Sequence, residues 1–276
     1  MNNPVIIGLL MVKNEDLYVQ QAIRNIESFC DHLIILDNGS TDNTLPILKT
    51  VAKRNPQIKL ESIHHIGESH APIEQYVGTP TWIFAVDGDE VYDPHGLRQM
   101  RKKIKKGELD SYFHIYGNVL HCDRLDFHSR TAWGYLSPPA KSMTKLYNFS
   151  VLQSWTGCSQ RLHGGQLVFK AGYADCQRCT MHLTTAWDEA RFRCLHMCLT
   201  RRSSLQIVDG PRFSPSDVLR RQAASQRFVG RVHFFTQSLH TFLFKKTGKD
   251  GAYRRGPRTK KDITPFFPFL GKQLLR

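Results

Sequence analysis

Carboxylate side chains crowd the end of a strongly hydrophobic stretch of the chain. Residues 82–94 read WIFAVDGDEVYDP, so Asp87, Asp89 and Glu90 follow a run of strand character directly, on a turn made by Gly88. Neighbouring carboxylates repel one another unless a cation or hydrogen bonds compensate their charge. Mg²⁺ or Mn²⁺ binds such oxygens and keeps its other positions for water and phosphate oxygens, so one interpretation is a divalent-metal site. The alternative is an ordinary Asp-Gly turn with solvated side chains.

Polar residues also follow two earlier hydrophobic stretches. Asn14 and Glu15 come after the run PVIIGLLMV, and Asp37 comes directly after the run HLIIL. In a parallel sheet the carboxyl ends of the strands share one edge, where ligands bind. We therefore expect these three residues to lie along one edge with Asp87 and Asp89.

The elements that must position these residues alternate between strand and helix. This alternation predicts an α/β fold, with a central, mostly parallel sheet flanked by helices. Further along, strands and loops give way at Trp187 to a helical pattern. The predicted strands cover residues 4–12, 32–36, 58–63 and 81–86, the predicted helices 19–29, 45–52, 188–208 and 216–244, and strands with loops 112–183.

Three motifs together resemble the signature of family 2 glycosyltransferases, which have the GT-A fold. They are VKNED, LDNGSTDNT and DGDE, in matching order over about the first 95 residues. The resemblance implies an inverting transferase that takes its sugar from a nucleotide sugar, expected to be UDP-linked, with Mn²⁺ or Mg²⁺ as cofactor. Carried over by position, Asn14, Glu15 and Asp37 are nucleotide-binding candidates, and Asp87 and Asp89 are metal and diphosphate candidates. Glu90 matches an acidic position in the subgroup that builds lipopolysaccharide and other surface glycans.

The second half departs from this family pattern at the expected catalytic base. His163 matches a histidine of the subgroup, but Gly164 stands where a glutamate is usual. Glycosyl transfer needs a base for the acceptor hydroxyl. Asp188 and Glu189 are the candidates, ahead of the weaker Asp123 and Asp126. Since GT-A enzymes often add a late histidine to the metal site, His163 and His182 are further metal-ligand candidates.

A group of cysteines and histidines in the second half could hold a structural zinc ion. The alternative for Cys194 and Cys198 is that they are small core residues one turn apart on a predicted helix. The group consists of Cys176, Cys179, His182, Cys194, His196 and Cys198.

Basic residues dominate the last part of the chain, and the formal net charge is +14. Such an excess indicates an anionic partner. Arg201 and Arg202 are candidates for binding the donor phosphates or an anionic acceptor, and the alternative is a solvated helix end. We expect a GT-A domain over residues 1–205 and a basic helical extension over 206–276. Its outer part, 245–276, mixes basic and aromatic residues, as is typical of segments that lie on an anionic membrane.

The function predicted from these observations is transfer of a sugar to a glycan or lipid-linked acceptor. The chain has no run of about 18 apolar residues that could span a membrane, and its start has no cleavage signal. We therefore expect a cytoplasmic protein, peripheral on the inner face of a membrane. The alternatives are a sugar-1-phosphate nucleotidyltransferase, whose glycine-rich phosphate loop is absent, and a zinc-stabilised nucleic-acid-binding protein, although no nucleic-acid-binding signature is present.

Overall fold

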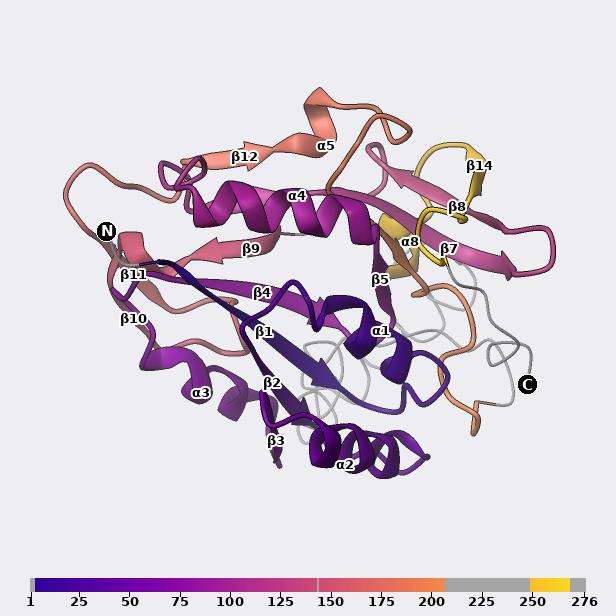
Figure 1. The fold of residues 1–276 in the computed structure, drawn as a ribbon, viewed down its shortest axis with the longest axis horizontal. Helices are drawn as coiled ribbons and strands as arrows, with labels where there is room; N and C mark the ends of the chain where they lie inside the picture. The colour runs from indigo at the N-terminus through magenta and orange to yellow at the C-terminus, as the bar shows by residue number, and fades with distance from the viewer. Residues whose placement is uncertain (1–2, 143, 207–248, 269–276) are drawn as a thin grey trace, which may run out of the picture.

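The computed structural model describes residues 3–142, 144–206 and 249–268. They form two mixed sheets and a two-stranded antiparallel sheet, with helices packed against the larger main sheet (Figure 1). The elements in chain order are β1 (Val5–Val12), α1 (Val19–Ile26), β2 (His32–Asp37), α2 (Thr44–Arg54), β3 (Ile58–Ser62), η1 (Ile66–His70), α3 (Ala71–Glu74), β4 (Thr81–Asp87), β5 (Glu90–Tyr92), α4 (Pro94–Lys105), β6 (His114–Tyr116), β7 (Asn118–Asp126), β8 (Thr131–Ser137), β9 (Thr144–Asn148), η2 (Phe149–Val151), β10 (Leu152–Thr156), β11 (Gln166–Phe169), β12 (Arg178–Thr180), α5 (Met181–Thr184), β13 (Arg193–His196), α8 (Lys249–Tyr253) and β14 (Arg258–Asp262).

The main sheet has the strand order β12-β6-β9-β4-β1-β2-β3. The strands β4, β1, β2 and β3 are parallel to their neighbours, whereas β9 runs antiparallel to both β4 and β6. Strand β12 is parallel to β6 at the edge. The expected α/β class with a mostly parallel central sheet is therefore confirmed.

Both faces of the main sheet are covered, which explains why its strands are hydrophobic without alternation. On one face, apolar residues of β1, β2 and β4 pack against α1, α2 and α4. On the other face, Ile7, Leu9 and Ile83 pack with Ile73 of α3 and with Leu152 of the β10-β11 hairpin. Each strand thus buries side chains of both orientations.

The second sheet begins where the main sheet ends. Its order is β14-β8-β7-β13-β5, and β5 follows β4 after only Gly88 and Asp89. Figure 1 shows β7, β8, β14 and α8 gathered at one end of the molecule, away from β10 and β11. Its apolar face is closed by Leu120, Leu195, Trp187 and Phe266. The turn at residues 87–89 therefore forms the junction of the two sheets.

The expectation of a continuous helix over residues 188–208 is wrong, because β13 lies within it. β13 pairs with β7 on one side and β5 on the other. Burial between two strands outweighs the helical spacing of its apolar residues. Cys194 is therefore on a strand, and Cys198 follows that strand in a turn.

The C-terminal segment that the structure describes adds a strand as well as a helix. β14 pairs antiparallel with β8, and Phe266 and Phe267 are buried in the core of the second sheet. The extension thus differs here from the purely helical one expected. The domain boundary at residue 205 stays a prediction, and the helix predicted over 216–244 lies outside the described residues. Among the described helices, none has both the length and the apolar character needed to cross a membrane.

Candidate functional site

The Asp87–Gly88–Asp89 turn lies against the loop that follows β1. A side chain in place of Gly88 would bring its Cβ to 2.3 Å from Oε2 of Glu15, so only glycine leaves room for that carboxylate. Glu15 and Asp89 are both buried. The end of β1 and the junction of the two sheets therefore form one carboxylate-rich site.

Arg161 reaches the site from the loop between β10 and β11. Its guanidinium donates to Oδ1 of Asp87 at 2.8 Å and to the carbonyl of Val86 at 3.3 Å. Burial raises the pKa of Asp87, but the Arg161 charge, helped by His196, outweighs it and leaves that pKa below its usual value. Asp87 is therefore ionised and able to bind a cation at neutral pH.

His196 and Arg202 lie on the two sides of Asp89. Nε2 of His196 is 3.5 Å from Oδ1, and a guanidinium nitrogen of Arg202 is 3.7 Å from Oδ2. Burial lowers the pKa of His196, but Cys198 and the Asp89 carboxylate outweigh it, so that pKa lies well above its usual value. Two positive groups thus compensate a carboxylate that is withdrawn from water.

Asp87, Asp89 and His196 can offer one ligand atom each within 4.8 Å of one another. Two carboxylates and one imidazole are donors that suit Mn²⁺, and carboxylates alone suit Mg²⁺. Because these donors converge at the carboxyl end of β4, the residues present fit a divalent ion.

Behind the turn, Glu90 forms a buried ion pair with Lys145 of β9. Its other carboxylate oxygen accepts a hydrogen bond from the Tyr92 hydroxyl at 2.9 Å. Burial lowers the pKa of Lys145, but the Glu90 charge outweighs it and holds that pKa above its usual value. Glu90 is thus occupied by internal partners, which indicates a supporting role.

The ends of β1 and β2 form a second part of the site, in which Asn14, Ser40 and Thr41 surround Asp37. The backbone N–H of Thr41 donates to Oδ1 of Asn14 at 2.8 Å, and the Asn14 N–H donates to Oγ of Ser40 at 3.1 Å. Asp37 accepts the Ser40 N–H through Oδ2 at 3.2 Å, and its buried Oδ1 accepts no hydrogen bond from the described residues. Oδ1 of Asp37 therefore has an unused acceptor position among the described residues.

Of the two predicted arginines, Arg202 lies at this site and Arg201 does not. Its guanidinium donates to Oε1 of Glu15, whereas that of Arg201 donates to the carbonyls of Ser203 and Ser204 in its own turn. Arg201 is exposed. The structure thus brings together Asn14, Glu15, Asp37, Asp87 and Asp89, but not Arg201.

The predicted histidines lie elsewhere. His163 is exposed in the loop after β10, and Gly164 beside it has φ +73°, a left-handed conformation that a glutamate would adopt only with strain. His182 is in α5, with its ring 5.6 Å from that of Tyr116. Neither belongs to the ligand cluster around Asp87, whereas His196 does.

The two base candidates also lie apart from this cluster. Asp188 pairs with Lys261 at 2.5 Å, and its side chain is 74% exposed. Its neighbour Trp187 packs on the Leu195 face of β13, whereas His196 points the opposite way along the alternating strand. Glu189 lines a pocket together with residues of α4. The structure therefore does not bring Asp188 or Glu189 to Asp89.

Two residues of the site have no motif around them in the sequence. Arg161 and Lys145 come from a loop and a short strand far along the chain from Asp87. Their only signal is that buried carboxylates need compensating positive charge. That requirement predicts that partners exist without saying which residues they are.

A match to a known protein family covers most of the region that forms this site. The family model described as glycosyl transferase family 2 matches residues 9–165, more than half of the chain. An uncharacterized glycosyltransferase of Rickettsia typhi is 24% identical over 139 residues, which are 50% of this chain and 44% of that protein. An uncharacterized glycosyltransferase of Rickettsia prowazekii is also 24% identical, over the same shares. The chain thus spans less than half the length of these relatives.

Solved structures show a weaker likeness. S. aureus TarS in complex with UDP is 16% identical, with 80% of this chain and 64% of that chain covered and a TM-score of 0.35. A mannosyltransferase from Pyrobaculum calidifontis in complex with GDP-Man and Mn²⁺ is 14% identical, with 45% and 37% covered and a TM-score of 0.32. Scores this low leave the family match as the basis for assigning the chain.

Proposed function

Because the chain belongs to glycosyl transferase family 2, we propose that it moves a sugar, with inversion, from a nucleotide-sugar donor to a hydroxyl group of a glycan or lipid-linked acceptor. The observation that carries this proposal is the convergence of Asp87, Asp89 and His196 beside the polar ends of β1 and β2. The family match covers most of this region, although His196 lies beyond it. The donor is expected to be UDP-linked.

The nucleoside part of the donor would lie over the ends of β1 and β2. Oδ1 of Asp37 is buried and open to a hydrogen-bond donor, such as an N–H of a base or a hydroxyl of a ribose. Asn14 and Glu15 flank it from the loop after β1. This half of the site therefore supports nucleotide recognition.

Asp87 and Asp89 would hold Mn²⁺ or Mg²⁺, with His196 next to Asp89. A divalent ion there supplies positive charge for the leaving diphosphate, whose charge grows in the transition state. The carboxylates are held in place by Arg161 and Arg202. The two arginines also keep the site from being strongly negative before an anionic donor arrives.

The acceptor hydroxyl must lose its proton to a base as the new bond forms. The sequence predicts Asp188 or Glu189 for this role. Their placement on the far side of β13 and beside α4 gives no support to a direct contact with a sugar held near Asp89. The identity of the catalytic base is therefore tested separately, by substitution of Asp188 and Glu189.

Attachment to an anionic membrane also stays a proposal. In the described part of the basic segment, Arg254 and Arg255 are exposed, whereas Arg258 pairs with Asp123 and Lys261 pairs with Asp188. Part of the charge is therefore used within the protein. Sedimentation with anionic vesicles at low salt tests the proposal, and a chain that stays in solution overturns it.

The donor site is tested by calorimetry of UDP binding with and without Mn²⁺. We expect binding by the wild-type chain only with metal, and loss of that binding in Asp89→Asn. Asp110→Asn, an exposed aspartate just beyond α4, is the matched control and should bind as the wild type does. The same measurement with GDP in place of UDP tests which nucleotide base the site accepts. Equal UDP affinity of Asp89→Asn and the wild type would refute the site.

A further inference from the structure

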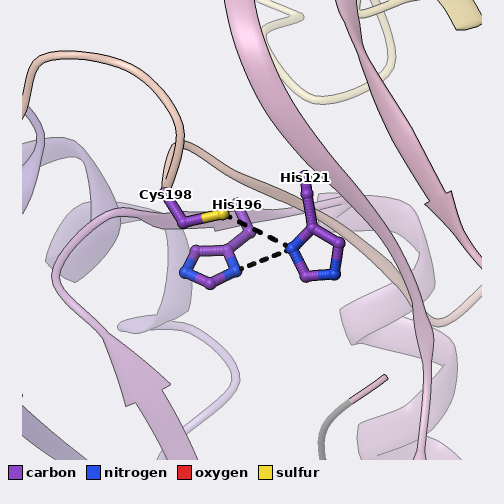
Figure 2. Close-up of side chains that lie close together, drawn as sticks. All are labelled: His121, His196 and Cys198. Atoms are coloured by element: carbon purple, nitrogen blue, oxygen red, sulfur yellow. Dashed lines mark hydrogen bonds between the residues drawn. The ribbon is translucent and has the colours of Figure 1, made fainter. Parts of the chain in front are cut away.

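Three potential metal ligands meet in the interior on the opposite side of His196 from Asp89. They are His121 of β7, His196 at the end of β13 and Cys198 in the following turn, with 0%, 4% and 1% of their surfaces exposed. Figure 2 shows Cys198 and the His196 ring both directed at Nδ1 of His121. The distances from that nitrogen are 3.2 Å to Nδ1 of His196 and 3.5 Å to Sγ of Cys198.

These two distances are the edge lengths of a tetrahedral zinc site. With Zn–N bonds of about 2.0–2.1 Å and Zn–S bonds of about 2.3 Å, tetrahedral angles place two nitrogens about 3.3 Å apart and a nitrogen and a sulfur about 3.5 Å apart. We propose that His121, His196 and Cys198 form a buried binding site for Zn²⁺ or a similar transition-metal ion. The three protein ligands leave one position for water or a further group.

The hydrogen-bond pattern around His121 supports this assignment. Nε2 of His121 is 2.8 Å from the carbonyl oxygen of Lys141, so Nε2 carries the proton and Nδ1 presents a lone pair. Both His196 and Cys198 then face one lone pair, which accepts one good hydrogen bond, whereas a metal ion uses all three ligand atoms at once.

Metal binding has a defined proton balance. The Cys198 thiol releases its proton as the metal–sulfur bond forms, and His196 releases the proton on Nδ1. Nε2 of His196 keeps its proton, 3.5 Å from Asp89, so with zinc on Nδ1 the ion of the proposed donor site would be held by the carboxylates of Asp87 and Asp89 without His196. A carboxylate behind a metal-bound histidine is a recurrent arrangement that fixes the ring.

The site differs in chemistry from the one at Asp87 and Asp89. A thiolate and two imidazoles select zinc-like ions, whereas oxygen donors select Mg²⁺ and Mn²⁺. The Tyr253 ring stacks on His121 with centroids 4.4 Å apart and covers the cluster from the C-terminal segment. A metal there would join β7 to the turn that leads to Arg202, so the inference goes beyond the proposed transfer reaction and does not depend on it.

Metal analysis of the full chain tests the proposal. Protein produced with added Zn²⁺ and dialysed without chelator should hold about one zinc ion per chain. After replacement of zinc by Co²⁺, a thiolate-to-cobalt absorption band should appear in the near ultraviolet. Cys198→Ser should lose the zinc and the band, whereas Cys30→Ser, also a buried cysteine, should keep both.

Two further variants make each outcome decisive. Asp89→Asn should keep the band, which separates this site from the proposed donor site, and His121→Asn should lose it even if Cys198→Ser does not fold. A wild-type chain without bound zinc or without a cobalt–thiolate band overturns the proposal. So does a folded Cys198→Ser variant that keeps both signals.

Discussion

Lys145 and Glu90 form an ion pair whose side chains are only 3% and 1% exposed, directly behind the turn that carries Asp87 and Asp89. Breaking a buried pair on one side costs about 3–5 kcal/mol, because the remaining charge is left without compensation. We expect Lys145→Met to lose about that much unfolding free energy in urea denaturation. Adding Glu90→Gln should restore most of it. A loss below about 1 kcal/mol in the single variant would contradict this account.

Arg202 and its neighbour Arg201 provide a matched pair of variants. Arg202→Gln removes the cation between Glu15 and Asp89, so their charges would repel an incoming diphosphate. We expect UDP affinity in the presence of Mn²⁺ to fall about tenfold or more, equivalent to about 1.4 kcal/mol. Arg201→Gln should bind as the wild type, since the Arg201 guanidinium donates to carbonyls of its own turn. Equal affinities of both variants would rule out this role for Arg202.

The base assignment is tested by Asp188→Asn and Glu189→Gln. A general base contributes about 10²–10⁴-fold, so a true base would lower turnover by that factor and leave UDP affinity unchanged. From the position of Trp187 on the face of β13 opposite His196, we expect both variants to keep turnover within about threefold of the wild type. A large loss in either variant would instead support the assignment from sequence.

Removal of the C-terminal segment should destabilise the protein. A chain that ends at residue 248 lacks β14 and the buried Ile263 and Phe266, each of which contributes about 1.5–3 kcal/mol by burial. We expect a lower Tm in calorimetry than for the full chain. A chain ending at residue 268 is the control, because it keeps this segment. Equal Tm values for the chains ending at 248 and 268 would refute the structural role.

His114 should make stability depend on pH. Burial lowers the pKa of this ring to about 4, although Asp175 partly opposes the effect, whereas the unfolded value is about 6.5. The unfolded state therefore binds more protons between these values, and stability falls as pH decreases from about 6.5 to 4, by at most about 1.4 kcal/mol per pH unit. His114→Phe keeps the packing against Tyr147 and should flatten this slope. The exposed His128→Gln should not change it.

The strands that carry the proposed donor site could be predicted because the sequence patterns that indicate them are local. The strands β1, β2 and β4 are continuous apolar runs, and each ends in polar residues within one or two positions. The placement of Asp37 and Asp87 follows from that pattern once the sheet is parallel. No contact between distant segments is needed for these predictions.

The positively charged partners of the carboxylates could not be predicted, because their placement depends on contacts between residues far apart in the sequence. His196 lies on a four-residue strand whose sequence has helical spacing, and only pairing with β5 and β7 makes it a strand. Arg161 reaches Asp87 from a loop whose conformation depends on left-handed glycines such as Gly164. Such contacts are properties of the assembled chain.

The insertion of β13 between β5 and β7 has a consequence for synthesis of the chain on the ribosome. β5 and β7 are made early, but the strand that joins them is translated only at residues 193–196. Until then both strands present open edges, which are prone to pair with other chains. Translation that stops before residue 193 would therefore release an aggregation-prone fragment rather than a smaller working protein, although every carboxylate of the donor site would already be present.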